Sequence, residues 1–337
     1  MIQMPGSKFK NVLVIGGAGY VGSALVPSLL KKDYNVTVYD LYLYGDVFSN
    51  LKNKKNLTEI KADIRDKKKL FEASKNVDAI IHLACISNDP SYELNPALSK
   101  SINYDAFFNI LEAAEKNDVK RFIYASTSSV YGVKKEKDIT EKTVPEPLTD
   151  YSKYKLECEK VLLGREINGM ERTILRSATV CGYAPRMRFD LTVNILTINA
   201  LINKVIKIFG GKQLRPNINI QDVVRAYEIF LSAPRNKINR EIFNVGYQNK
   251  TVEEIAYIVK NVIGGESITF EYVPTEDTRS YHINSDKIKK VLEFTPKYTI
   301  EGAIQSIVNA YNEGHINDGL NNPIYHNIKL MQKINLK

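Results

Sequence analysis

The chain has 337 residues, 44% of them hydrophobic and 25% charged, which is an ordinary composition for a globular protein with an ample core. Its apolar runs fall short of the roughly 18 residues that a membrane helix needs, and no secretory signal stands before the first of them, so we expect a cytoplasmic protein rather than a membrane or secreted one. The net charge of +9 does not by itself indicate nucleic-acid binding, because the lysines are scattered and form no basic stripe interleaved with aromatic residues.

The first predicted elements are a strand at residues 12–15 and a helix at residues 21–30, joined by a glycine-rich turn. The turn reads Gly16-x-x-Gly19-x-x-Gly22. Its first glycine permits the turn, its second lets the backbone approach a pyrophosphate, and its third lets helix and strand pack closely. The sequence therefore predicts a dinucleotide-binding site, and Asp40, at the end of a second strand over residues 35–40, stands where a ribose-binding carboxylate is needed.

Strands and helices continue to alternate through the first half of the chain. Further strands are expected at residues 57–61, 77–84, 119–125 and 171–176, and helices at residues 67–74, 96–117 and 153–163. Such alternation predicts parallel βαβ units and a doubly wound sheet, whose ligands bind outside the carboxyl ends of the strands.

The second half alternates less regularly, which indicates a smaller, mixed domain interleaved with the sheet. Helices are expected at residues 191–201, 251–262, 285–292 and 300–312, and strands at residues 205–209 and 241–246. We therefore predict an NAD-type dinucleotide-binding domain at residues 1–178 plus about 212–247, and a substrate domain at about 179–211 and 248–325. The tail after Gly314 is rich in asparagine and is expected to be only partly ordered.

The three cysteines are an odd number without metal-ligand spacing, which indicates neither disulfides nor a zinc site. Cys85 and Cys181 stand at the ends of predicted strands and are expected to be small, buried hydrophobic residues. We therefore predict no metal.

The pattern that indicates an enzyme is Tyr151-x-x-x-Lys155, because residues four apart on a helix share one face. An ammonium nearby favours the tyrosinate, so Lys155 is expected to lower the pKa of Tyr151 from about 10 and let it take a proton from a substrate hydroxyl. An exposed aromatic–cationic pair would look the same in the sequence. The hydroxyl-rich residues 126–129, at the end of an upstream strand, favour the catalytic interpretation because they can hydrogen-bond a reacting oxygen.

Taken in order, these motifs resemble the extended short-chain dehydrogenase/reductases, most closely the nucleotide-sugar epimerases and dehydratases. The resemblance covers roughly residues 10–312 and rests on the glycine turn, Asp40, Asp63-Ile64, His82-Leu83-Ala84, Asn103, residues 126–132 and Tyr151-x-x-x-Lys155. It implies a Rossmann-like α/β fold with a smaller C-terminal substrate domain, an NAD cofactor and a nucleotide-diphosphate sugar as substrate. It also implies a homodimer, paired through two long helices near residues 96–117 and 150–163.

The resemblance implies a role for each matching residue. Thr127 would orient the reacting oxygen, Tyr151 would be the acid–base, and Lys155 would hold the nicotinamide ribose. Asp40 would bind the adenosine ribose, which favours NAD over NADP because a carboxylate repels a 2′-phosphate. The implied cofactor-binding residues are Gly16, Gly19, Tyr20, Val21, Gly22, Asp40, Asp63, Ile64, Leu83, Ala84, Asn103, Ser126, Tyr151 and Lys155.

On the substrate side the resemblance implies a set of hydroxyl, amide and arginine side chains. They are Ser128, Ser129, Thr179, Arg188, Asn194, Arg215 and Arg279, with Arg176 and Arg186 as further candidates. Arginine forks suit a diphosphate. Ser128 and Ser129 occupy the places of the Asp–Glu pair with which sugar 4,6-dehydratases eliminate water, so dehydration is disfavoured. Thr179 replaces an asparagine that epimerases of this type usually have, which alters sugar binding there.

Residues 178–194 are similar to members found in bacterial surface-polysaccharide pathways, some of which oxidise C4 of a GDP-linked heptose and keep NADH bound. The prediction is an NAD-dependent enzyme that oxidises C4 of a nucleotide-diphosphate sugar, as a 4-epimerase or, alternatively, as a 4-dehydrogenase that releases the keto-sugar. The alternative from another class is a non-catalytic NAD-binding regulatory protein. The intact Thr127, Tyr151 and Lys155 weigh against it, because such proteins commonly lose the tyrosine.

Overall fold

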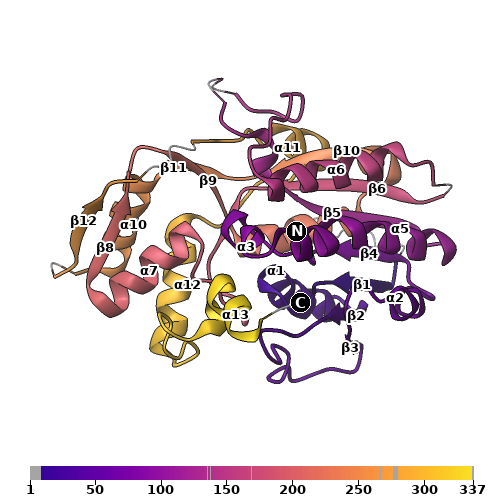
Figure 1. Ribbon diagram of the computed structural model, residues 1–337, viewed down its shortest axis with the longest axis horizontal. Helices are drawn as coiled ribbons and strands as arrows, with labels where there is room; N and C mark the ends of the chain where they lie inside the picture. Colours follow the sequence, from indigo (N-terminus) through magenta and orange to yellow (C-terminus); the bar gives the residue numbers. More distant parts are fainter. Residues whose placement is uncertain are drawn as a thin grey trace.

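A seven-stranded parallel sheet forms the centre of the protein (Figure 1). The computed structural model describes residues 9–134, 136, 138–167, 169–265, 267–275 and 280–335. The sheet has the strand order β10-β6-β5-β4-β1-β2-β3. Its strands are β1 (Asn11–Ile15), β2 (Asn35–Asp40), β3 (Leu57–Lys61), β4 (Ala79–His82), β5 (Arg121–Thr127), β6 (Glu171–Ser177) and β10 (Glu241–Val245). The order reverses between β1 and β4, so the predicted Rossmann-like, doubly wound α/β fold is confirmed.

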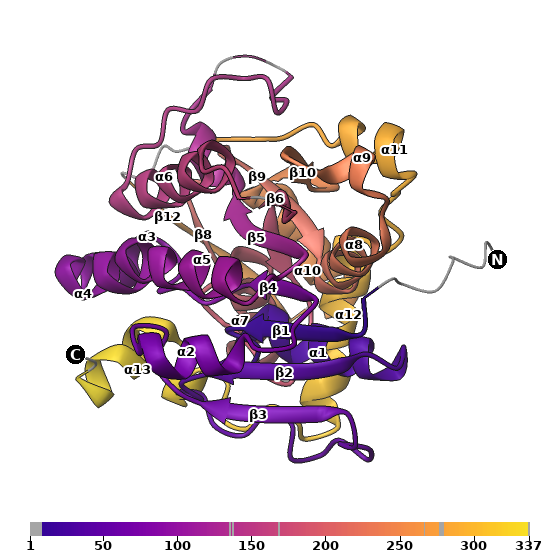
Figure 2. The same cartoon turned by 90° about the vertical axis from the view of Figure 1, so that its right-hand side faces the viewer.

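Helices cover both faces of this sheet (Figure 2). One face carries α2 (Lys67–Ala73), α5 (Ala106–Lys116) and α6 (Asp150–Gly164), and the other carries α1 (Tyr20–Lys31) and α8 (Ile220–Ser232). Successive residues of β1 enter two cores, Val12 and Val14 on the side of α1, Leu13 and Ile15 on the side of α5. A strand that is buried on both faces is a nearly continuous run of apolar residues, so these strands could be predicted from the sequence. None of the helices in the described part of the chain is both long and apolar enough to cross a membrane.

Two small sheets and further helices lie to one side of the large sheet (Figure 1). One sheet contains β11 (Gln248–Thr251), β9 (Leu214–Asn219) and β7 (Thr179–Cys181), and the other contains β12 (Thr269–Val273) and β8 (Val205–Phe209). Helices α7 (Thr192–Asn203), α10 (Val252–Ile263) and α12 (Ile300–Asn312) pack with them, while α9 (Arg235–Ile238) and α11 (Asp286–Leu292) lie near β10. Strand β9 falls in the segment assigned to the dinucleotide-binding domain but pairs with β7 and β11, and the domain boundaries stay a prediction.

The helix predicted over residues 96–117 is interrupted. The structure has α4 (Pro96–Lys100), a π-helical turn (Ser101–Asp105) and then α5, preceded by α3 (Asp89–Glu93), which the sequence did not indicate. Within the π turn, the Asn103 side chain accepts a hydrogen bond from the Ile86 N–H at 2.8 Å and donates one to the Ile86 carbonyl at 2.9 Å. A wide turn of this kind is common at functional sites, and here it anchors the segment that follows β4.

The tail after Gly314 is ordered as far as the structure describes it, which corrects the expectation of partial order. It contains a 3₁₀ turn (Pro323–Tyr325) and the helix α13 (Asn327–Ile334), which lies beside α3 (Figure 1). Tyr325 packs its ring 5.5 Å from that of Phe189, and Met331 is buried. The tail is rich in asparagine, so the sequence did not indicate that these few apolar side chains would pack against the rest of the protein.

His82 ends β4 inside an aromatic cluster, with its ring centroid 5.7 Å from those of Phe107 and Tyr124. The side chain is 2% exposed, and its Nδ1 has no hydrogen-bond partner among the described residues. Burial, with a smaller effect of the Lys155 charge, lowers the pKa of His82 to about 3. In the unfolded chain the pKa of a histidine is about 6.5. Between this pH and the pKa of the folded state, the unfolded chain binds a proton that the folded chain does not. The free energy of unfolding therefore falls as the pH is lowered through this range.

We therefore expect His82→Phe to make the protein less sensitive to acid. Between about pH 6.5 and pH 4, the free energy of unfolding of the original protein should fall by roughly 1 kcal/mol per pH unit more than that of the variant. Urea unfolding of both proteins at several pH values in this range measures the difference. If the free energies of unfolding of the two proteins change with pH in the same way, His82 is not the cause of the acid sensitivity.

Candidate active site

A cavity of about 550 Å³ opens at the carboxyl ends of β1, β2, β4 and β5. Its walls come from the glycine turn, the segments after β2, β3 and β4, the first turns of α6, residues 177–192 and the helix α13. This edge of a doubly wound sheet, next to the reversal of strand order, is where such folds bind ligands. The cavity is therefore the candidate active site.

The glycine turn has the shape that a phosphate cradle requires. Gly16 has a φ of +83°, and a Cβ atom on it would stand 2.4 Å from the backbone nitrogen of Ala84. A Cβ on Gly22 would stand 2.4 Å from the Gly17 carbonyl oxygen, so helix and turn could not pack as they do. Gly19 caps α1 without a side-chain hydrogen bond, which leaves the positive end of the helix open toward the cavity.

Asp40 lies beside the glycine turn on the same wall. Its carboxylate accepts hydrogen bonds from the backbone N–H groups of Ala18 at 3.0 Å and Tyr42 at 2.8 Å. Burial raises the pKa of Asp40, although these two hydrogen bonds oppose the shift. The other predicted cofactor residues on the cavity wall are Tyr20, Val21, Asp63, Ile64, Leu83, Ala84 and Ser126.

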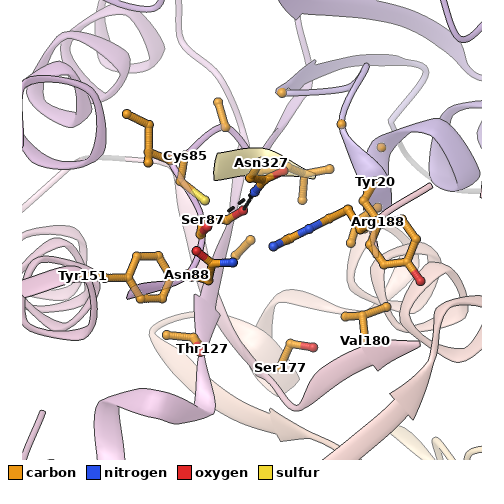
Figure 3. Close-up of a pocket in the computed structure, with 18 of the residues that line it drawn as sticks. Tyr20, Cys85, Ser87, Asn88, Thr127, Tyr151, Ser177, Val180, Arg188 and Asn327 are labelled. Carbon is orange, nitrogen blue, oxygen red and sulfur yellow. Dashed lines mark hydrogen bonds between the residues drawn. The ribbon is translucent and has the colours of Figure 1, made fainter. Parts of the chain in front are cut away.

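Thr127 and Tyr151, two of the predicted catalytic residues, reach the cavity from neighbouring elements (Figure 3). Thr127 ends β5, and its hydroxyl lies 3.0 Å from the Ser129 hydroxyl. Tyr151 lies in the first turn of α6, whose start is fixed by a capping box between Thr149 and Ser152. Strand end and helix start together place both hydroxyls on one side of the cavity.

Lys155, the third predicted catalytic residue, lines the cavity one helical turn after Tyr151. Its ammonium donates a hydrogen bond to the Ala125 carbonyl at 2.8 Å and lies 5.0 Å from the ring centre of Tyr124. The side chain is 4% exposed. Lys155 thus ties the catalytic helix to the strand that carries Thr127.

The predicted lowering of the Tyr151 pKa by Lys155 is wrong for the protein without its ligands. Burial raises the pKa of Tyr151 well above its ordinary value, Cys85 raises it further, and the cation that opposes the shift is Arg188. Cys85 is itself only partly buried, on the cavity wall, contrary to the expectation of a buried residue, whereas Cys181 is fully buried.

Arg176, a candidate for the substrate side, lies outside the cavity and forms a buried ion pair instead. Its guanidinium is buried with the carboxylate of Glu159 in α6, with nitrogen–oxygen distances of 2.6 to 3.2 Å. It also donates to the Tyr131 hydroxyl at 2.9 Å. Although burial opposes the charge, Glu159 raises the pKa of Arg176. The pair joins β6 to the catalytic helix and leaves no group for a substrate phosphate.

Arg188 and Tyr151 enter the cavity from opposite sides, with Asn88 between them (Figure 3). Asp190 holds Arg188 through two hydrogen bonds of 2.9 and 3.0 Å and accepts a third from the Asn88 amide at 3.0 Å. Asn88 has φ +74° and ψ 158°, a conformation that usually requires glycine and costs about 1–3 kcal/mol. Such strain on the cavity wall, beside the candidate acid–base, is typical of a functional segment.

The other predicted substrate residues divide into two groups. Ser128, Ser129, Thr179 and Arg215 line the cavity. Asn194 is fully buried behind the wall, where it donates to the Tyr20 hydroxyl and the Arg188 carbonyl, both at 3.0 Å. Asn103 lies behind the wall in the same way, and Arg279 falls outside the described residues.

Several residues of the cavity wall were not predicted from the sequence. They are Tyr44, Ser87, Asn88, Asp190, Asn327 and Met331. Asn327, from the tail, donates a hydrogen bond to the Ser87 hydroxyl at 3.0 Å, drawn in Figure 3. Only Asn88 offered a clue, because it directly follows the segment after β4, where ligands of such sheets bind.

The residues present fit a bound dinucleotide. Glycines at positions 16 and 22 let the turn pack against its neighbours as the fold requires, the open N-terminus of α1 faces the cavity, and Asp40 lines the same cavity. The Asp40 carboxylate is partly buried and held in place by two backbone N–H groups, which suits a ribose hydroxyl and repels a 2′-phosphate.

Comparisons with known proteins agree with this geometry. The model of the NAD dependent epimerase/dehydratase family matches residues 12–246. A putative UDP-glucose 4-epimerase of Methanocaldococcus jannaschii is 32% identical over an alignment of 317 positions, which covers 88% of this chain and 97% of the relative.

Two solved structures are similar along nearly their whole length. The UDP-glucose 4-epimerase of Thermotoga maritima, solved with UDP-glucose, has a TM-score of 0.79 and 28% identity, covering 90% of this chain and 99% of that one. MoeE5, solved with UDP-glucose and NAD, has a TM-score of 0.78 and 26% identity, with the same coverage of 90% and 99%.

Proposed function

Because the chain belongs to the NAD dependent epimerase/dehydratase family, we propose that it oxidises C4 of a nucleotide-diphosphate sugar and most simply completes a 4-epimerisation. The resemblance to this family is confirmed, and with it NAD as the cofactor. Relatives whose names specify a 4-epimerase of UDP-glucose support C4 as the reacting carbon.

The observation that carries the proposal is the position of Thr127, Tyr151 and Lys155 on one wall of the cavity that also contains the glycine turn. Tyr151 takes the proton of the C4 hydroxyl, and Thr127 hydrogen-bonds the same oxygen. Bound NAD supplies a positively charged nicotinamide ring that accepts the hydride. Burial raises the pKa of Tyr151, so the phenol keeps its own proton at neutral pH before the ligands bind and has to release it before it can accept the proton of the C4 hydroxyl.

The remaining wall of the cavity suits the sugar and the diphosphate. Arg188 and Arg215 present guanidinium groups, which bind phosphates through paired hydrogen bonds. Ser128, Ser129 and Thr179 offer hydroxyls to the sugar. None of these three is an acid that could help to expel water, so the arrangement favours epimerisation or simple oxidation over dehydration. Arg279 remains a proposed phosphate contact on sequence grounds.

The alternative outcome is a 4-dehydrogenase that releases the keto-sugar, because both reactions begin with the same proton and hydride transfer. Incubation with UDP-, GDP- and dTDP-sugars, followed by the absorbance of reduced nicotinamide and by NMR of the sugar, separates them. We expect a new C4 epimer without lasting reduction of the cofactor. Lasting reduction with a keto-sugar would favour the dehydrogenase. An enzyme inert to all three sugar classes, but able to bind NAD, would favour a non-catalytic regulatory protein.

We also propose a homodimer and a place in surface-polysaccharide sugar biosynthesis. Support for the dimer is the exposed part of the helical face formed by the π turn and α5, where Phe108 remains 38% exposed beside Tyr104. Light scattering of the purified protein tests the dimer.

A further inference from the structure

Arg186 is a buried cation with no carboxylate in contact among the described residues. Its side chain is 4% exposed, and among the described residues no carboxylate lies within 4.0 Å of its guanidinium. Its Nε has no hydrogen-bond partner in the described part of the chain. Burial lowers the pKa of Arg186 to about 10. Of the other buried arginines in the described part of the chain, Arg121 pairs with Glu171 and Arg176 with Glu159. Arg172 has no carboxylate partner either, but it donates to the Leu162 and Arg165 carbonyls away from the cavity, whereas Arg186 lies on the cavity wall. A buried, unpaired charge is costly, so such a group points to an anionic ligand.

The side chain is nevertheless held firmly. Its guanidinium carbon lies 3.6 Å from the ring centre of Tyr44, and its Nη2 donates a hydrogen bond to the Asn327 side-chain oxygen. The same oxygen accepts a hydrogen bond from the Tyr44 hydroxyl at 3.1 Å. The backbone N–H of Arg186 donates to the Ser23 hydroxyl on α1 at 3.1 Å. The guanidinium is therefore preorganised by neutral groups, as in a site that awaits an anion.

The surroundings indicate which anion it is. Arg186 lines the same cavity as the glycine turn, its backbone is bonded to α1, and Tyr44 follows Asp40 along the chain. The charge of Arg186 also acts on Asp40, lowering its pKa against the effect of burial. Arg186 is thus linked to the first turns of α1 and to the segment that follows Asp40, and both belong to the predicted cofactor side of the cavity.

We propose that Arg186 binds the diphosphate of the bound NAD, and that Tyr44 and Asn327 position it for this contact. The guanidinium and the N-terminus of α1 would both contribute to holding the diphosphate. Both NAD and the sugar nucleotide carry a diphosphate, and the neighbours of Arg186 favour NAD. The inference concerns cofactor binding alone, so its test does not depend on which reaction the enzyme catalyses.

Calorimetry on the cofactor-free, full-length protein tests it with NAD, ADP, adenosine, UDP and GDP. We expect Arg186→Met to weaken the binding of NAD and ADP about tenfold or more, since hydrogen bonds to charged groups are lost, and to leave adenosine unaffected. The affinity of Arg186→Lys for NAD and ADP should lie between those of the original protein and Arg186→Met. Lysine keeps the positive charge but lacks the paired N–H donors of the guanidinium. The matched control is Arg165→Met, which removes an arginine whose surface ion pair with Glu115 lies away from the cavity, and which should bind NAD normally.

Thermal unfolding of the cofactor-free variants completes the test. Replacement of an unpaired buried cation by methionine should leave the melting temperature unchanged or raise it. Unfolding of both Arg186 variants would make this arginine a structural residue and overturn the inference. An equal loss of affinity for adenosine and for NAD would also overturn the inference. Weakening of UDP or GDP with unchanged NAD binding would assign Arg186 to the substrate diphosphate instead.

Discussion

Tyr151→Phe is expected to lower turnover at least about 100-fold while the protein still folds and binds NAD. The substitution removes one oxygen atom, and that atom is the proton acceptor of the proposed reaction. The phenol lies on the cavity wall opposite Arg188, and the other tyrosine of α6, Tyr154, does not line the cavity and cannot take its place. Single-turnover reduction of the cofactor by the sugar nucleotide measures the chemical step directly.

A matched control lies three residues along the same helix. Tyr154 packs against Tyr92 and Tyr104, with ring centroids 6.0 and 5.2 Å away, and does not line the cavity. Tyr154→Phe should therefore keep turnover close to that of the original protein. Comparable losses in both variants would indicate a general disturbance of α6, and near-normal turnover of Tyr151→Phe would remove Tyr151 from the reaction.

Arg176→Met is expected to destabilise the fold by about 3–5 kcal/mol, because it leaves the Glu159 carboxylate buried without its cation. Both side chains are almost fully buried, at 3% and 2% exposure. After the substitution, Glu159 would retain the hydrogen bond from the Ser126 hydroxyl and little else. Denaturant unfolding, with the midpoint and slope compared between the proteins, measures the loss.

Two further variants distinguish a buried-charge effect from a packing defect. Glu159→Leu combined with Arg176→Met should be more stable than Arg176→Met alone, because the stranded carboxylate is gone. Lys153→Met breaks the exposed pair with Asp150 on the same helix and should cost less than about 1 kcal/mol. If the double variant is no more stable than the single one, the loss at Arg176 comes from packing.

The parts of the site that the sequence located are those specified by short segments. The glycine turn, Asp40 and the Tyr151–Lys155 pair each depend on one strand end or one helix turn, and all line the cavity. Their identity is set largely by the local backbone, since a φ of +83° favours glycine at position 16 over residues with a side chain.

The parts that the sequence did not locate depend on contacts between distant segments. Arg176 and Arg186 look alike in the sequence, yet one meets the carboxylate of Glu159 and the other meets only neutral side chains. Asn327 joins Tyr44 across 283 positions of the chain, and no periodicity or spacing could indicate such a contact. The break in the helix over residues 96–117 likewise follows from the two hydrogen bonds between Asn103 and the segment after β4.

The position of α13 has a consequence for the order in which the protein matures. A nascent chain emerges with its first residues leading, so the glycine turn and β1 are exposed long before Asn327 is made. The strand β10, which completes one edge of the large sheet, is also a late arrival. A chain made only as far as β10 can complete the large sheet but still lacks Asn327 and Met331 of the cavity wall. The cavity therefore gains its last wall after the sheet is complete, and truncation anywhere before α13 leaves that side of the cavity open.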